Sequence, residues 1–285
     1  DFICPTQETA APMVATRSHN HSESPRTHET SDSKLPGHWL LAKMGKRVLR
    51  PGGLRLTHQL LTALNIQSTD NVVEFAPGLG VTARLVLARN PLKYTAVERD
   101  AAAAATVRQY LPPSHPCVVG SAEETGLPAE SAAVVFGEAM LSMQPAPTKT
   151  RIVKEAVRLL RFGGRYGIHE LCLVPDEVEE QTRIAIQQEL SHDIHVGVRP
   201  LTRLEWHDLL KYEGLQIDAE FIAPMHLLEP RRLVQDEGLF GAMRFVWNVA
   251  RNPLARQRVM HMRRVFRKYR SHLAAIAIVG RKTGN

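Results

Sequence analysis

The sequence has few cysteines and no long apolar run. Its three cysteines, Cys4, Cys117 and Cys172, are odd in number and far apart, which argues against a disulfide framework or a CxxC metal site. No apolar stretch approaches the roughly 20 residues that span a bilayer. The first residues also lack the basic-then-apolar pattern of a secretory signal. We therefore expect a cytoplasmic protein with reduced cysteines.

Large apolar residues are scarce in residues 1–36, which are rich in Ser, Thr, His and Pro. Such a segment cannot bury enough surface to offset its chain entropy. We expect a disordered tail there, and interpret its His19, His21 and His28 as part of a flexible polar segment rather than a metal site. One folded domain is expected over residues 37–285.

From residue 53 onward, helical and strand patterns alternate. A helix is predicted after Gly53, with Thr57, Leu60, Leu61 and Leu64 on one face. Further helices are predicted over 81–89, 101–110 and 148–161, and strands over 71–75, 94–97, 117–119, 133–136 and 165–173. Gly163 and Gly164 are predicted to cap the last of these helices. The alternation predicts βαβ units, and hence an α/β fold with a doubly wound, mostly parallel seven-stranded sheet.

The pattern changes after Pro175. Helices are predicted over 176–191, 202–213, 230–250 and 254–270, with strands over 215–222 and 273–279. The last run is almost entirely apolar, which is typical of a central strand buried on both faces. Residues 224–270 therefore form a basic helical insertion before the last strand.

Residues 72–80, VVEFAPGLG, carry the strongest functional signal. Ala76, Gly78 and Gly80 lie where a predicted strand meets a predicted helix, and such small residues let the backbone approach a ligand closely. Glu98 ends the next predicted strand, where an acid can bind both hydroxyls of a ribose. The two features together predict a nucleoside site.

Glu74 discriminates between two kinds of nucleoside cofactor. Residues 78–83 also satisfy the GxGxxA pattern of dinucleotide binding, so a nicotinamide cofactor is an alternative. A carboxylate just ahead of the loop repels a pyrophosphate, which prefers a bare helix N-terminus. It suits a phosphate-free nucleoside that carries an ammonium and a sulfonium group, and S-adenosylmethionine is that cofactor.

Residues 71–172 resemble the core of the class I S-adenosylmethionine-dependent methyltransferases of the small-molecule type. VVEFAPGLG is similar to the first family motif, E/D-x-G-x-G-x-G, with Ala76 where glycine is usual. The resemblance implies that Glu74 holds the methionyl amino group and that Glu98 binds the ribose, with Arg99 beside the adenine. It also implies that the loop containing Phe75, Ala76, Gly78 and Gly80 binds the cofactor.

Three later segments resemble further motifs in the family's order. Residues 120–128 are similar to GDAEELP, with Ser121 in place of Asp, which implies that Ser121 and Ala122 meet the adenine. Residues 134–140 resemble the fourth-strand motif, so Glu138 is expected to face the cofactor. Residues 159–165 resemble the LLRPGGR turn before the fifth strand. The resemblance implies a Rossmann-like methyltransferase.

Methyl transfer requires mainly that two reactants be aligned, because the cofactor carries the activated group. A base is needed only where the acceptor must lose a proton. His169 and Glu170, at the end of the predicted fifth strand, are our catalytic candidates, the alternative being a histidine bonded to backbone. Arg50 is either a contact of the methionyl carboxylate or a solvated turn residue.

Metal binding is not expected, because the cluster His192-Asp193-x-His195 lacks a recognised zinc spacing. The insertion allows two interpretations. Its large apolar residues could line a lipophilic cavity, with its arginines on anionic lipid headgroups as in a peripheral membrane helix, or both helices could simply pack on the core with the arginines in water. The residues concerned are Leu239, Phe240, Met243, Phe245, Trp247, Arg231, Arg232, Arg256, Arg263, Arg264 and Arg267.

We expect a small, lipophilic acceptor. The basic balance of the chain, with a net charge of +7, keeps a nucleic-acid methyltransferase as an alternative. Against it, residues 138–141 read EAML where base-amine methyltransferases have a DPPY-like tetrapeptide that receives the flipped base. A nicotinamide-dependent oxidoreductase and a catalytically silent cofactor-binding module are the remaining alternatives.

Overall fold

The computed structural model describes residues 35–284, and the predicted tail and its three histidines lie almost wholly outside this range. Eight strands form one mixed sheet of order β3-β2-β1-β4-β5-β8-β7, with the two-residue β6 paired to β5. The strands are β1 (Asn71–Phe75), β2 (Lys93–Glu98), β3 (Cys117–Val119), β4 (Ala132–Glu138), β5 (Leu160–Leu173), β6 (Leu201–Thr202), β7 (Leu215–Pro224) and β8 (Leu273–Lys282). All neighbours are parallel except β8, which is antiparallel to β5 and β7.

Helices alternate with the strands as the sequence predicts. They are α2 (Gly37–Lys43), α3 (Gly53–Leu64), α4 (Val81–Leu87), α5 (Ala101–Arg108), α6 (Ala146–Leu159), α7 (Glu180–Ile194), α8 (Arg203–Tyr212), α9 (Pro230–Arg251) and α10 (Pro253–Lys268), with a 3-10 turn η1 (Leu141–Met143) after β4. The doubly wound fold is confirmed. None of these helices is both long enough and apolar enough to cross a membrane.

Two helical layers sandwich the sheet. Helices α3, α4 and α5 pack on one face and α6 and α8 on the other, each around its own buried cluster. The central strand β8 shows why: Ala275 and Ala277 belong to the α3 cluster, whereas Ile276 and Ile278 belong to the α6 cluster, because successive side chains of a strand point to opposite faces. The predicted central, buried last strand is therefore confirmed.

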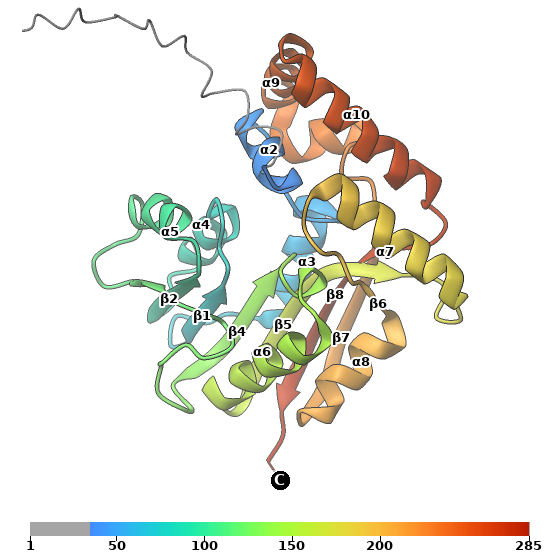
Figure 1. Cartoon of the computed structure of the whole chain (residues 1–285). Helices are drawn as coiled ribbons and strands as arrows, with labels where there is room; N and C mark the ends of the chain where they lie inside the picture. Colours follow the sequence, from blue (N-terminus) through green and yellow to red (C-terminus); the bar gives the residue numbers. More distant parts are fainter. Residues whose placement is uncertain (1–34, 285) are drawn as a thin grey trace, which may run out of the picture.

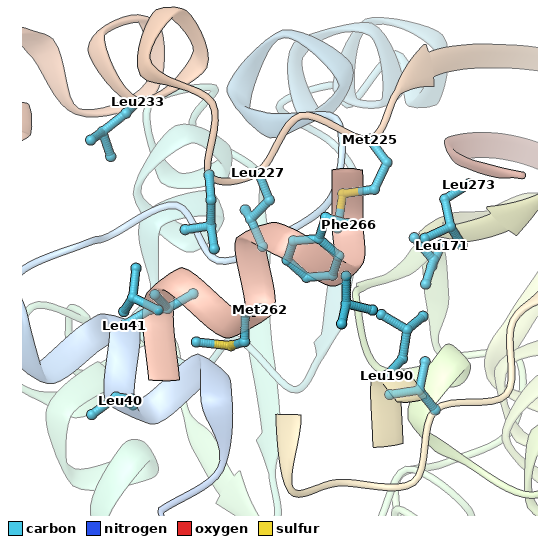
Figure 2. Close-up of a cluster of buried hydrophobic side chains, with 14 of the residues drawn as sticks. Leu40, Leu41, Leu171, Leu190, Met225, Leu227, Leu233, Met262, Phe266 and Leu273 are labelled. Carbon is cyan, nitrogen blue, oxygen red and sulfur yellow. The ribbon is translucent and has the colours of Figure 1, made fainter. Parts of the chain in front are cut away.

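A third apolar cluster lies at one end of the sheet. It joins α2, α9 and α10, which lie at the top of Figure 1, with α7, which lies below α10. It includes Leu40 and Leu41 of α2, Leu190 of α7 and Met262 of α10 (Figure 2). The insertion of α9 and α10 between β7 and β8 thus covers the end of the sheet where β4 and β5 finish, rather than either face.

One detail of the predicted boundaries is wrong. Gly163 and Gly164 do not cap α6, which ends at Leu159, but lie inside β5, which begins at Leu160. Ala132 already pairs with Leu160, and the register shifts before Val134 pairs with Arg165. The glycines therefore absorb an irregularity in the strand, and Gly163 takes a φ of 72° that favours glycine.

Candidate active site

The carboxyl ends of the parallel strands and the helices above them enclose a cavity of about 650 Å³. Ala76 follows β1, Glu98 ends β2, Gly120 follows β3 and Glu138 ends β4, and all four line the cavity. Ligands of open α/β sheets bind at this edge, where the strand order reverses. Here the reversal lies between β1 and β4.

The loop after β1 leaves room for a ligand to approach its backbone. Ala76 and Gly78 have φ values of 51° and 54°, in the left-handed region. A Cβ added to Gly78 would meet only the Ala76 carbonyl oxygen, at 4.0 Å, so the space above this residue is open. The left-handed conformation costs Ala76 about 1–2 kcal/mol. Glycine avoids this cost because it has no Cβ, which is why glycine is usual at this position.

Glu98 links the loop to the second strand. Its Oε2 accepts a hydrogen bond from the Gly78 amide at 3.1 Å, and its Oε1 accepts one from the Asp100 amide at 3.0 Å. A carboxylate has about four lone-pair sites. Both oxygens of Glu98 can therefore accept further bonds from a vicinal diol such as a ribose.

Glu74 is almost completely buried, with 3% of its surface exposed, and accepts a 2.6 Å hydrogen bond from the Tyr94 hydroxyl. Burial raises the pKa of this carboxyl to about 8, because the Tyr94 bond and the Arg50 cation offset only part of the desolvation. Without a ligand the side chain is thus mainly neutral at pH 7. The anionic charge inferred from the sequence develops only when a cation enters the cavity.

Glu138 is the centre of a polar network at the end of β4. Its Oε1 accepts a bond from Thr57 at 2.6 Å, Oε2 accepts a short bond from Thr82, and Arg50 Nη1 lies 3.4 Å from Oε2. Burial alone would raise the pKa of Glu138, but the Arg50 cation and the His169 hydrogen bond lower it to about 2. This carboxylate is therefore ionised at every physiological pH.

Glu138 pairs with only one nitrogen atom of the Arg50 guanidinium group, Nη1. The side chain lines the cavity and is 8% exposed, and its Nε and Nη2 atoms are buried without hydrogen-bond partners among residues 35–284. Buried guanidinium donors normally find acceptors. A carboxylate is the acceptor that fits a guanidinium best, so Arg50 and Glu74 together fit the zwitterionic end of an amino acid.

The segment that carries Arg50 is fixed by acids of α9. The Glu237 carboxylate accepts bonds from the Arg47 and Val48 amides at 2.8 and 2.9 Å, and Asp236 accepts one from the Leu54 amide at 3.0 Å. Lys46 Nζ, which is fully buried, lies 3.6 Å from Glu237 and 3.9 Å from Asp236. The insertion thus holds in place the segment that covers the cofactor side of the cavity.

Of the ten residues expected at the cofactor, eight line the cavity: Glu74, Ala76, Gly78, Glu98, Arg99, Ser121, Ala122 and Glu138. The other two do not. The Phe75 side chain is fully buried in the core between the sheet and α6. Gly80 caps α4 and faces Tyr110, whose hydroxyl would lie 1.1 Å from an added Cβ. Gly80 is therefore required for packing and not for contact with a ligand.

His169 and Glu170, the catalytic candidates, serve the scaffold instead. His169 is fully buried, with Nδ1 2.7 Å from Glu138 and Nε2 2.5 Å from the Pro51 carbonyl oxygen. Scaffold groups thus engage both ring nitrogens, and His169 does not line the cavity. This contradicts the expectation of a base at His169.

Glu170 lines the cavity but its carboxylate is saturated. It accepts bonds from the Met140, Leu141 and Ser142 amides, and from the Ser142 hydroxyl at 2.7 Å. These bonds hold the turn after β4 against β5. Glu170 therefore shapes the cavity wall and has no free oxygen to offer an acceptor.

The other half of the cavity is apolar. It is lined by Leu41, Ile194, Val196, Val198, Met225, Leu227, Met262 and Phe266. Figure 2 shows Met262 and Phe266 projecting from α10 toward Leu41 and Leu227. The aromatic residues expected there from α9 are elsewhere: Phe240 and Trp247 are 86% and 60% exposed, and Phe245 is buried in the helical cluster.

The acidic and histidine residues at the end of α7 pair with each other and with α10. Asp193 Oδ1 lies 3.2 Å from His192 Nδ1 and 3.0 Å from His261 Nδ1. Among residues 35–284 there is no group of three or more His, Cys, Asp or Glu placed to hold a metal ion. Cys117 and Cys172 are buried free thiols.

Comparisons with known proteins agree with this geometry. Residues 73–168 match the model of a methyltransferase domain family. An uncharacterised protein of Haemophilus influenzae is 29% identical over 251 residues, which cover 86% of this chain and 98% of that protein.

Two solved structures share the fold. One is Haemonchus contortus phosphoethanolamine N-methyltransferase 2 in complex with S-adenosyl-L-methionine, with a TM-score of 0.67, 13% identity, and coverage of 91% of this chain and 59% of the other. The other is the cyclase SpnF, with a TM-score of 0.65, 14% identity, and coverage of 90% and 95%. The family match over the strands that build the nucleoside cavity, and the residues inside it, lead to one conclusion: the chain carries a class I S-adenosylmethionine-dependent methyltransferase domain.

Proposed function

We propose that the enzyme methylates a small acceptor with an apolar body. The observation that carries the proposal is the division of the cavity: charged groups gather at the strand ends, and the space under α2 and α10 is lined by aliphatic, methionine and phenylalanine side chains. Binding pockets of this kind recognise apolar ligands that are oriented by a few polar groups.

S-adenosylmethionine supplies the activated methyl group. In the proposal, Glu98 holds the ribose, Arg50 and Glu74 hold the methionyl carboxylate and amino group, and Arg99, Ser121 and Ala122 lie at the adenine. The apolar wall excludes water and holds the acceptor in line. Such alignment alone contributes up to about 7–11 kcal/mol to lowering the barrier.

The test uses methyl-labelled S-adenosylmethionine with two acceptor sources, a small-molecule extract and total RNA. We expect label to move into the organic-extractable products of the first mixture and not into the RNA. Label in acid-precipitable RNA would support the nucleic-acid alternative and overturn the proposal. Binding of S-adenosylhomocysteine with no transfer to either source would indicate a silent binding module.

We also propose that α9 and α10 rest on an anionic membrane surface. Leu239, Phe240, Met243, Val246 and Trp247 follow one face of α9 and are 57–86% exposed. Asp236 and Glu237, the acids of these two helices, are buried, so their exposed charges are all basic, as on Arg251, Arg256 and Arg264. Because two copies would oppose arginine to arginine, charge favours a bilayer over a second copy of the chain.

A vesicle assay tests this contact. Replacing Phe240 and Trp247 by Ser should reduce co-sedimentation with phosphatidylglycerol vesicles at least tenfold, because both side chains lose their place in the interface. Tyr212→Ser is the matched control, since Tyr212 is also 86% exposed but lies on α8. Equal sedimentation of all three proteins would exclude this face as the membrane contact. Equal binding to uncharged phosphatidylcholine vesicles would exclude the preference for an anionic surface.

A further inference from the structure

His38 is the one histidine that lines the cavity. It lies on α2, the first helix over the apolar half, and is partly buried. Its Nδ1 atom is buried without a hydrogen-bond partner among the described residues, and its ring lies beside that of Trp39 at a centroid distance of 5.2 Å. A buried, unpaired ring nitrogen is uncommon and indicates that a partner is supplied from elsewhere.

The carboxylates that line the cavity are already engaged. Glu170 and Glu138 are saturated as described, and Glu98 accepts backbone amides. Arg47 pairs with Glu237, and Glu123 pairs with Arg151 at 2.5 Å. Asp100 accepts the Ala102 and Ala103 amides at the start of α5, and Glu74 accepts the Tyr94 hydroxyl. Among the ionisable proton acceptors that line the cavity, His38 is thus left with a ring nitrogen that has no partner among the described residues.

The surroundings of His38 keep the ring neutral. Burial lowers the pKa of His38 below 6.5. The neighbours of Gly37 on α7 and α10 are the apolar Ile194 and Met262. The charged residues closest to them in sequence, Asp193 of α7 and His261 of α10, pair with each other at 3.0 Å. A neutral imidazole beside an apolar cavity is a proton acceptor at neutral pH.

We propose that His38 is the general base of the reaction and that the acceptor atom is the oxygen of a phenol or enol. The proposal depends on the methyltransferase function proposed above. The acceptor O–H bond breaks and its proton forms an N–H bond on His38, while the oxygen electron pair forms the new bond to the methyl carbon and the carbon–sulfur pair returns to sulfur. The imidazolium then loses its proton to water.

The chemistry of the cavity selects this acceptor class. An ammonium ion or a carboxylate would have to enter the apolar half as a charge, which is costly without a partner. A carboxylate would also need no base. A phenol enters neutral and becomes nucleophilic only when it gives up its proton beside His38, so burial and the base act together.

The experiment uses 4-nitrophenol as the probe, because its phenol and phenolate absorb at different wavelengths. The enzyme saturated with S-adenosylhomocysteine is titrated with the probe at a pH where free 4-nitrophenol is mostly protonated. We expect the wild-type complex to bind a larger fraction of the probe as phenolate than is present in free solution at that pH. His38→Asn should bind it as the neutral phenol, and should lower kcat about 10²–10⁴-fold with phenolic acceptors.

His58→Asn is the matched control, because His58 is exposed on α3. It should leave both the probe spectrum and the rate unchanged. Equal phenolate fractions in wild type and His38→Asn would overturn the role of His38, and failure of the probe to bind would overturn the phenol class. If S-adenosylhomocysteine itself fails to bind by calorimetry, the proposed function is wrong instead, so the two failures are distinct.

Discussion

Replacing Glu98 by alanine should weaken the binding of S-adenosylhomocysteine about 100-fold. Hydrogen bonds to a charged group are worth about 1.5–3 kcal/mol each, and a loss of about 2.7 kcal/mol corresponds to a factor of about 100 in Kd. The substitution removes the acceptor for the ribose and also frees the Gly78 amide, which Glu98 binds at 3.1 Å. Isothermal titration calorimetry measures the change directly.

Glu98→Gln is the informative companion to this variant. The amide keeps the size of the side chain and one acceptor oxygen, so we expect a loss of only about tenfold. Circular dichroism spectra that match the wild type would show that the fold is intact. Wild-type affinity in Glu98→Ala would exclude this residue as the ribose contact.

The affinity for S-adenosylmethionine should rise about tenfold between pH 6 and pH 7. Free Glu74, with a pKa of about 8, is protonated over this range. The bound cofactor brings an ammonium and a sulfonium group that favour the ionised carboxylate, so the bound-state pKa is lower and binding releases a proton. The affinity therefore grows as pH rises toward 8 and is lost as pH falls.

Titrations in buffers of different ionisation enthalpy measure the proton released, which we expect to approach one per cofactor at pH 6.5. In Glu74→Gln the release and the pH dependence should both disappear, because the amide does not titrate. Glu130→Gln is a control on an exposed carboxylate that lies outside the cavity. The same pH dependence in Glu74→Gln as in the wild type would show that another group binds the cofactor cation.

Most residues on the cofactor side of the cavity could be predicted from the sequence because they lie close together along the chain. Glu74, Ala76 and Gly78 belong to one strand and its turn, and Glu98 ends the next strand, so the parallel pairing of β1 and β2 is enough to bring them together. Phe75 and Gly80 were expected to contact the cofactor but do not line the cavity. A sequence motif contains residues that pack in the protein interior as well as residues that contact the ligand. The alternation of the strand turns Phe75 into the core, and Gly80 gives room to Tyr110.

The residues that complete the site come from distant parts of the chain. Thr57, Thr82 and His169 all converge on Glu138, and no spacing in the sequence relates them. His169 lies inside β5, which continues to Leu173, and not at the end of the strand as predicted. The sequence did not reveal its partners, which engage both ring nitrogens. No sequence pattern pointed to His38. What distinguishes this residue is a ring nitrogen without a hydrogen-bond partner, which only the folded structure shows.

By itself the sequence determined the order of strands and helices, the nucleoside loop and the type of cofactor. The order of the elements follows from hydrophobic periodicity, and the type of cofactor follows from the acidic residue Glu74 next to the loop of small residues. Both signals involve residues that are close together in the sequence. Only the tertiary structure decided which buried groups remain unpaired, because hydrogen-bond saturation is settled by long-range packing. Contacts between segments nearly 200 residues apart, such as Arg47 with Glu237, place Arg50 over the cavity.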